Sequence, residues 1–423
     1  MILACTSWPL SMISGSLVRT LNRGAGILRI NGHRLLSEPS TRNSLALIQN
    51  RIGYLPNSRQ MSTNIAVPTT QIAYGKPIEH LASLSSVANP GELSFPDGVR
   101  HALVVDCGEQ TPVTSSSDHE FLERIKNFVK EQDSQDVDFI RIQGLHPQNT
   151  PNELTWKALN GLRPRHLELC CGWHEEYEIE PLDSLDPSWP LESISILGAA
   201  QYELAITKHF WTIPTLTFYY SHQVRLELPS DYTVEGPSAL RHLTAIGNDA
   251  CDMLTRWRKS SISSICDNLE SLRLESNNDC DFQTDNEYED FVHALQGCTS
   301  VKSLELVMVE SPSSDNNPEQ DQYLKDQYQS LIDLPKYLPP NLERLKFRSI
   351  PESAQHLDVW LQCAKDPHWL PHLKSISLQF DMVVRDHDRA EKPPLTPDRN
   401  ETTELLESVY QTLALRHPSV GSL

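Results

Sequence analysis

Residues 268–274 read NLESLRL, and residues 341–347 repeat this stretch as NLERLKF. Both contain the pattern apolar-x-x-apolar-x-apolar, whose final alternation is typical of a strand with one buried face. Copies of the pattern recur along the chain at intervals of 22 to 41 residues, within the period range of repeat proteins. The last apolar residues of these copies are Val105, Ile142, Leu169, Ile196, Phe218, Ala245, Leu274, Leu306, Phe347 and Leu378.

Helical periodicity fills several intervals between the predicted strands. A capping box at Ser117 and Glu120 opens one such interval, and Gly297 closes another where a helix C-cap belongs. Alternating strand and helix patterns predict an α/β solenoid, in which stacked units bury a continuous core. The apolar stripes of the predicted helices lie at residues 121–129, 288–295, 357–364 and 405–413.

A second repeat is independent of the apolar pattern. DPSWPLESISI at residues 186–196 closely matches DPHWLPHLKSISL at residues 366–378, and WTIPTLTF at residues 211–218 is a shortened copy. Proline ends a helix, and tryptophan can fill the space between a helix and a sheet. These stretches therefore predict equivalent junctions between a helix and the next strand.

The NLESLRL and NLERLKF stretches resemble leucine-rich repeats. The irregular spacing and the Trp-Pro-Leu junctions are similar to the repeat regions of fungal F-box/leucine-rich-repeat proteins, over roughly residues 95–385. The resemblance implies an irregular leucine-rich-repeat-like solenoid, with a curved parallel sheet, helices on the convex side and a concave binding face. No F-box precedes the repeats in this sequence, where a basic segment stands instead.

Residues 1–75 differ in composition from the rest of the chain. They hold seven arginines, no lysine and one acid, Glu38, together with many serines. Such a composition is typical of a mitochondrial presequence, and it predicts import into the matrix. A disordered basic tail, or translation that starts at Met61, would explain the same residues. The expected parts are a presequence at 1–63, a linker or N-terminal cap at 64–94, a solenoid at 95–390 with a polar insertion at about 311–322, and a polar loop with a C-terminal capping helix at 391–423.

The charge balance limits the classes of partner. The chain has 36 Lys and Arg against 56 Asp and Glu, a formal net charge of −20, which disfavours nucleic acid and anionic lipid. No stretch approaches the roughly 20 apolar residues that cross a bilayer, so stable membrane insertion is not expected. No glycine-rich phosphate-binding motif is present, and no cofactor is expected.

One residue per unit lies between the last two apolar positions and should face the concave surface. These residues carry both signs of charge, which suits another protein better than a polyanion. An ordinary solvated surface would have the same composition. The predicted partner-binding residues are Arg141, Glu168, Ser195, Thr217, Arg273, Glu305, Lys346 and Ser377.

Cys170, Cys171 and His174 are the densest group of potential metal ligands. Structural zinc sites usually have two spaced ligand pairs, and no second pair matches this one. The group remains a minor candidate for a metal site or a reactive centre.

These features together predict a non-catalytic mitochondrial scaffold that binds another protein through its concave face. Analogy of fold suggests a role in assembling a mitochondrial complex. One alternative is a cytosolic or nuclear F-box-like substrate adaptor that lacks the F-box. The other is a metal-binding or enzymatic protein centred on Cys170, Cys171 and His174.

Overall fold

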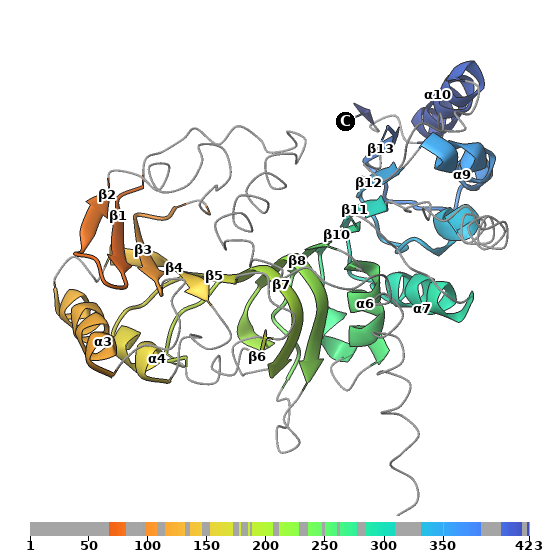
Figure 1. The fold of residues 1–423 in the computed structure, drawn as a ribbon. Helices are drawn as coiled ribbons and strands as arrows, with labels where there is room; N and C mark the ends of the chain where they lie inside the picture. The colour runs from red at the N-terminus through yellow and green to blue at the C-terminus, as the bar shows by residue number, and fades with distance from the viewer. Residues whose placement is uncertain are drawn as a thin grey trace, which may run out of the picture. The chain divides into compact units, whose positions relative to one another are not determined.

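Figure 1 shows the computed structural model of the chain. The residues it describes all belong to one compact unit, Ser44–Leu423. The predicted presequence at 1–63 and the polar insertion at 311–322 lie outside them. The described residues are 67–81, 96, 98–107, 115–131, 136–145, 153–171, 177–178, 185–186, 188–205, 211–227, 236–247, 250–259, 263–276, 285–308, 331–349, 351–381, 399–416 and 421–422.

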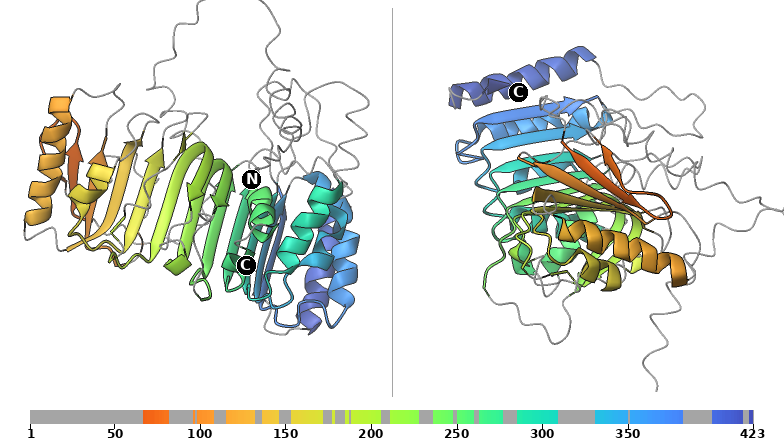
Figure 2. Two further views of the ribbon diagram at one scale, coloured as in Figure 1. Left: turned by 90° about the horizontal axis from the view of Figure 1, so that it is seen from below. Right: turned by 90° about the vertical axis from the view of Figure 1, so that its left-hand side faces the viewer.

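The described strands form one sheet of 14 strands, in the order β14-β13-β12-β11-β10-β9-β8-β7-β5-β4-β3-β1-β2, with β6 paired to β7. Every pair is parallel except β1 with β2. From β3 onward the strands follow one another in chain order, as Figure 2 shows. The strands are β1 (Thr69–Ala73), β2 (Glu79–Leu81), β3 (His101–Asp106), β4 (Val137–Leu145), β5 (His166–Cys171), β6 (Tyr177–Glu178), β7 (Ser193–Ala205), β8 (Thr215–Glu227), β9 (His242–Gly247), β10 (Ser271–Ser276), β11 (Ser303–Met308), β12 (Arg344–Ser349), β13 (Ser375–Phe380) and β14 (Gly421–Ser422).

The apolar pattern of the sequence coincides with the register of this sheet. All ten residues that end the pattern lie in one row, from Val105 paired with Ile142 to Phe347 paired with Leu378. The prediction of an α/β fold with repeated parallel strands is confirmed. The sheet also includes β1 and β2, which fall in the segment predicted as a linker or cap.

The α-helices connect strands and bury their apolar faces against the sheet. Phe121 and Ile125 of α3, for example, join Leu103 and Ile140 of the strands in one large hydrophobic cluster. The same cluster contains buried residues of the later helices and strands, so a continuous core runs under successive units. The helices are α3 (Ser115–Lys130), α4 (Glu153–Leu159), α6 (Ala250–Lys259), α7 (Asp285–Gln296), α9 (Leu357–Lys365) and α10 (Arg399–Arg416), with short 3₁₀ turns η4 (Ser263–Cys266), η5 (Leu331–Tyr337) and η6 (Pro351–His356).

Two predicted helix ends differ from the structure in detail. Helix α3 begins at Ser115, so the predicted cap Ser117 lies inside the helix; it follows two other serines, each also a favourable cap. Gly297 does follow α7, but its φ is not positive. A Cβ there would lie 2.6 Å from Nη2 of Arg258, which donates a hydrogen bond to the Gly297 carbonyl at 3.1 Å. Close approach of Arg258 accounts for this glycine.

The duplicated Asp-Pro-x-Trp stretches form the same turn twice. In each copy the aspartate side chain accepts a hydrogen bond from the backbone N–H two residues later, at 2.9 Å. Its carbonyl accepts another from the tryptophan N–H at 3.1 Å. The Trp189 indole is then buried in the hydrophobic cluster, and the half-buried Trp369 indole packs against it. The four bonds join Asp186 to Ser188 and Trp189, and Asp366 to His368 and Trp369.

Charged residues of alternating sign lie at or next to the N-terminal ends of successive parallel strands, and we call them the edge ladder. All of them except Arg100 take part in backbone hydrogen bonds between neighbouring units; the Glu270 N–H, for instance, donates to the Arg241 carbonyl at 2.8 Å. Only Pro214 interrupts the alternation, between Glu192 and Arg241. The edge ladder consists of Arg100, Asp138, Arg165, Glu192, Arg241, Glu270, Lys302, Glu343 and Lys374.

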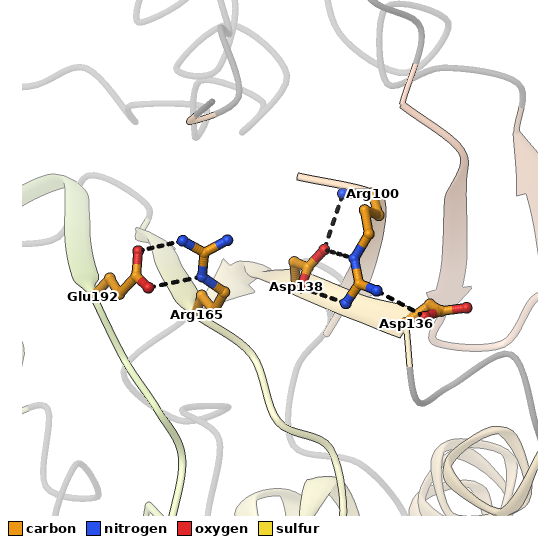
Figure 3. Close-up of polar contacts among 5 residues, drawn as sticks. All are labelled: Arg100, Asp136, Asp138, Arg165 and Glu192. Carbon is orange, nitrogen blue, oxygen red and sulfur yellow. Dashed lines mark hydrogen bonds and ion pairs between the residues drawn. The ribbon is translucent and has the colours of Figure 1, made fainter. Parts of the chain in front are cut away.

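Side-chain pairs join neighbouring members of the edge ladder (Figure 3). Arg165 donates from Nε and Nη2 to the two carboxylate oxygens of Glu192, at 2.8 and 2.7 Å. Arg100 donates to Asp138 at 2.9 and 3.0 Å. These hydrogen bonds hold the pKa values of the Glu192 and Asp138 carboxyl groups below their usual range. Arg165 and Glu192 form an exposed pair, whereas the Asp138 carboxylate is buried beside the exposed Arg100.

The NLESLRL stretch now has a structural reason at almost every position. Leu269, Leu272 and Leu274 are buried in the hydrophobic cluster, and Glu270 belongs to the edge ladder. Asn268 ties its unit to the preceding one by a side-chain bond to a backbone carbonyl. Ser300 and Asn341 do the same in later units, and the three bonds are Asn268 to Ser238 at 2.9 Å, Ser300 to Asp267 at 2.7 Å and Asn341 to Thr299 at 2.9 Å.

Helix α10 covers the end of the stack at β13. Its Val409 and Leu413 are fully buried, and the hydroxyl of Tyr410 accepts a hydrogen bond from the Leu378 N–H at 2.9 Å. Strand β14, which follows this helix, pairs with β13. Burial of apolar surface at a terminal unit is what a solenoid requires of a cap.

Candidate functional site

The eight predicted partner-binding residues lie in one row of the sheet. Their strands are β4, β5, β7, β8, β10, β11, β12 and β13, and each is paired in register with the equivalent residue of the neighbouring strand. Between β8 and β10 the row continues through Thr244 of β9. We call these nine residues the middle row. Because they alternate with the core positions, they lie on the face opposite the helices, which we call the open face.

The first two residues of the middle row are enclosed. Arg141 and Glu168 are only 4% and 9% exposed, and they form an ion pair with each other. The Arg141 guanidinium also lies 5.8 Å from the centroid of the Phe139 ring. Phe139 packs with Val104 in a second hydrophobic cluster. This part of the row is therefore packed interior, in contrast to the solvated surface expected from the sequence.

The centre of the row is neutral and partly exposed. Ser195, Thr217 and Thr244 all have intermediate exposure. Thr244 was missing from the predicted set because its unit ends in Ala245, a small residue that weakens the apolar pattern. The preceding Leu240 and Leu243 are both buried and were the available signal.

The later part of the row carries charge. Arg273 donates from Nη2 to Glu275 at 2.8 Å and lies 3.8 Å from a carboxylate oxygen of Glu305. Lys346 of β12 is the next residue in register, and Ser377 of β13 follows it with 8% exposure. The usable polar surface of the middle row is therefore the part from Ser195 to Lys346.

Two further cations share the open face with Lys346. Arg344 and Arg348 are the alternate residues of β12, and the apolar residues between them are buried. They were not predicted because only one residue per unit, between the last two apolar positions, was expected on this face. The six-residue strand RLKFRS contained the signal, since every second residue is basic.

A shallow polar groove of about 590 Å³ lies along the N-terminal edge of β9 to β13. Edge-ladder residues contribute to its lining, and Arg241 and Lys302 both approach the carboxylate of Glu270, at 3.7 and 3.8 Å. Because these charges already pair with one another, the groove holds fewer uncommitted groups than its polarity suggests.

The candidate metal residues are not assembled by the described structure. Cys170 of β5 donates from Sγ toward Glu168 at 3.7 Å. The Cys171 side chain and all of His174 lie outside what the structure describes. Within the described ranges, no three His, Cys, Asp or Glu side chains form a group that could hold a metal ion.

Two thiols, the partly buried Cys107 and the buried Cys298, are poor candidates for nucleophiles. Burial raises the pKa of Cys107 to about 12 and that of Cys298 to about 11. Both therefore remain protonated at neutral pH, whereas a reactive cysteine needs its thiolate form.

Comparison with known proteins identified no relative of this chain. None of the helices in the described part of the chain is both long and apolar enough to span a bilayer. No protein-family model matches the chain, and no curated protein matches its sequence.

Proposed function

We propose that the protein is a non-catalytic, leucine-rich-repeat-like scaffold that binds another protein through its open face. The observation that carries this proposal is the alignment of residues from successive units in the middle row. Charged groups of both signs on a sheet held by backbone bonds form a preorganised surface, which lowers the entropic cost of binding. In this proposal the scaffold makes and breaks no covalent bond in its partner. Recognition rests on complementary shape and charge.

The repeated units support the leucine-rich-repeat-like assignment. From β9 to β13, each contains a six-residue parallel strand preceded by a buried leucine or valine, and Asn268 and Asn341 bond to backbone carbonyls of the preceding unit. Repeat proteins of this construction commonly use the face of their sheet for binding.

A capture experiment tests the open face. The full chain carrying a photo-crosslinker at Thr217 is compared with the same protein containing Arg273→Glu, or Lys365→Glu on the exposed side of α9. We expect Arg273→Glu to abolish crosslinks that Lys365→Glu preserves. Equal crosslinking by all three proteins would overturn the proposal, provided that circular dichroism shows Arg273→Glu to be folded.

The proposed location is the mitochondrial matrix, with a role in assembling a mitochondrial complex. Support comes from the arginine-rich, acid-poor composition of residues 1–63. Fusion of this segment to a fluorescent reporter should direct the reporter to mitochondria, and replacing Arg19, Arg23 and Arg29 by glutamine should prevent import. A diffuse cytosolic signal from the unaltered fusion would remove the matrix assignment.

A further inference from the structure

Strand β12 presents three basic side chains in succession on the open face. Arg344, Lys346 and Arg348 alternate with Leu345 and Phe347, whose side chains are buried in the core. We call the three cations the basic stripe. Arg344 is exposed, and the other two have intermediate exposure, so all three are accessible to a second molecule.

The charges of the basic stripe are largely unneutralised. Among the described residues, Arg344 and Lys346 form no ion pair, and Arg348 pairs only with Asp381, whose side chain is 63% exposed. Glu305 lies across from Lys346 in register, but its ion pair is with Arg273. The basic stripe therefore retains positive charge on a chain whose formal net charge is −20.

The neighbouring strands place serines beside Arg344 and Lys346. Arg344 has Ser303 and Ser375 as its register partners, and Lys346 has Ser377 on the β13 side. Serine side chains are shorter than these cations, and the half-buried Ser303 and Ser375 can donate hydrogen bonds to a carboxylate.

The spacing of the basic stripe selects a geometry for the ligand. Alternate residues of a strand are separated by roughly 6.4–6.8 Å, twice the rise per residue. An extended peptide places its own alternate side chains at the same interval. Carboxylates at positions i, i+2 and i+4 of such a peptide would each meet one cation.

We propose that the partner contributes an extended acidic segment that lies along β12, with alternate carboxylates bound by Arg344, Lys346 and Arg348. This assignment rests on the proposed function and adds the chemistry of the partner. A protein segment is favoured over nucleic acid because Glu275, Glu305 and Asp381 lie on or beside the same face. In addition, none of the open-face positions of β12 is an aromatic residue that could stack on a base.

The test is direct binding of synthetic peptides to the full chain, measured by fluorescence anisotropy. One peptide has three glutamates at alternate positions among threonines, and the control peptide has the same three glutamates at every third position. We expect the alternate peptide to bind more tightly. Lys346→Gln should weaken its binding about tenfold, whereas Lys346→Arg and the helix-side variant Lys365→Gln should preserve it.

The outcomes separate this inference from the proposed function. Equal binding of the two peptides, or an unchanged affinity in Lys346→Gln, would overturn the basic stripe as an acidic-segment site while the Arg273 crosslinking result stood. A single-stranded oligonucleotide that bound as tightly, and lost binding in Lys346→Gln, would identify a general polyanion site and also overturn it.

Discussion

Trp369 and Trp189 occupy equivalent places in the duplicated junction, but their indole N–H groups differ. Trp369 donates to the Pro335 carbonyl at 2.7 Å, whereas the buried N–H of Trp189 has no hydrogen-bond partner among the described residues. Phenylalanine removes a hydrogen bond at the half-buried Trp369, whereas at the buried Trp189 it removes a polar group that has no partner among the described residues. We expect Trp369→Phe to lower the free energy of unfolding by about 1 kcal/mol more than Trp189→Phe. Equal losses in urea denaturation would contradict the assigned bond.

Asp138 should contribute to acid sensitivity. Its hydrogen bonds with Arg100 lower its pKa in the folded state, so the folded protein binds this proton less readily than the unfolded chain does. The resulting stability is present above the unfolded pKa of about 3.9 and is lost as the pH falls through the lower, folded value. Asp138→Asn should therefore make the free energy of unfolding fall less steeply below about pH 5.

The control for this acid titration is Asp136→Asn, which removes an exposed carboxylate beside the same guanidinium. Denaturant curves from pH 6 to pH 2 compare the two variants with the unaltered chain. An Asp138→Asn curve parallel to that of the unaltered protein would show that the pair does not drive acid unfolding.

Single positions of the middle row were predictable because side chains alternate along every strand. Which charged residues of the edge ladder pair with one another was not predictable. Arg165 and Glu192 are separated by 27 residues, while the intervals between units vary from 22 to 41. Only the register of the folded sheet decides which charges become neighbours. Burial of Arg141 was equally hidden, since its local sequence is that of an exposed position.

The attachment of helix α10 to the preceding unit depends on one side chain near the C-terminal end of the helix. Arg416 donates to the carbonyls of Ala364, Pro367 and Trp369, at 2.7, 3.2 and 2.7 Å. We expect Arg416→Met to lower the free energy of unfolding by about 1.5–3 kcal/mol, the range for hydrogen bonds to a charged group. Amide hydrogen exchange in α10 should then accelerate. Glu407→Gln, an exposed change in the same helix, should leave the exchange rates unaltered; similar rates in both variants would refute the contribution of Arg416.

The elements found from the sequence are those with a strong buried side. The six-residue pattern located the parallel strands from β3 to β13, except β6, but it reported only the part of each strand that touches the core. Strands β7 and β8 are each 13 residues long in total. They extend well beyond Ile196 and Phe218, the last residues of the pattern in these strands. Helices α4 and α6, with 7 and 10 residues, were not predicted from the sequence, although α9, with only 9 residues, was.

For the whole molecule, the alternation of charge along the edge ladder should affect stability collectively. Glu270→Lys would place three cations side by side, with Arg241 and Lys302 as its neighbours. We expect a lower midpoint of thermal unfolding than in the neutral variant Glu270→Gln. The difference should shrink at 1 M salt, where the Debye length is about 3 Å. A difference that persists unchanged would point to packing instead of charge.

The α/β class of the described part of the chain was predictable because each unit contacts mainly its neighbours, so a local pattern repeated often enough implies the stack. The division of the open face was not predictable. Its enclosed part around Val104 and Phe139 and its charged part on β12 arise from different units, hundreds of residues apart, that share one sheet.

The alternation of charge along the edge ladder also limits how many units such a chain can gain or lose. Only an even number preserves the alternation. Excising the unit of β10 would bring Arg241 beside Lys302, two like charges at strand spacing. Excising the units of β10 and β11 together would bring Arg241 beside Glu343 and restore an attractive pair. Recombination that adds or removes units in this region should therefore be tolerated in even numbers more readily than in odd ones.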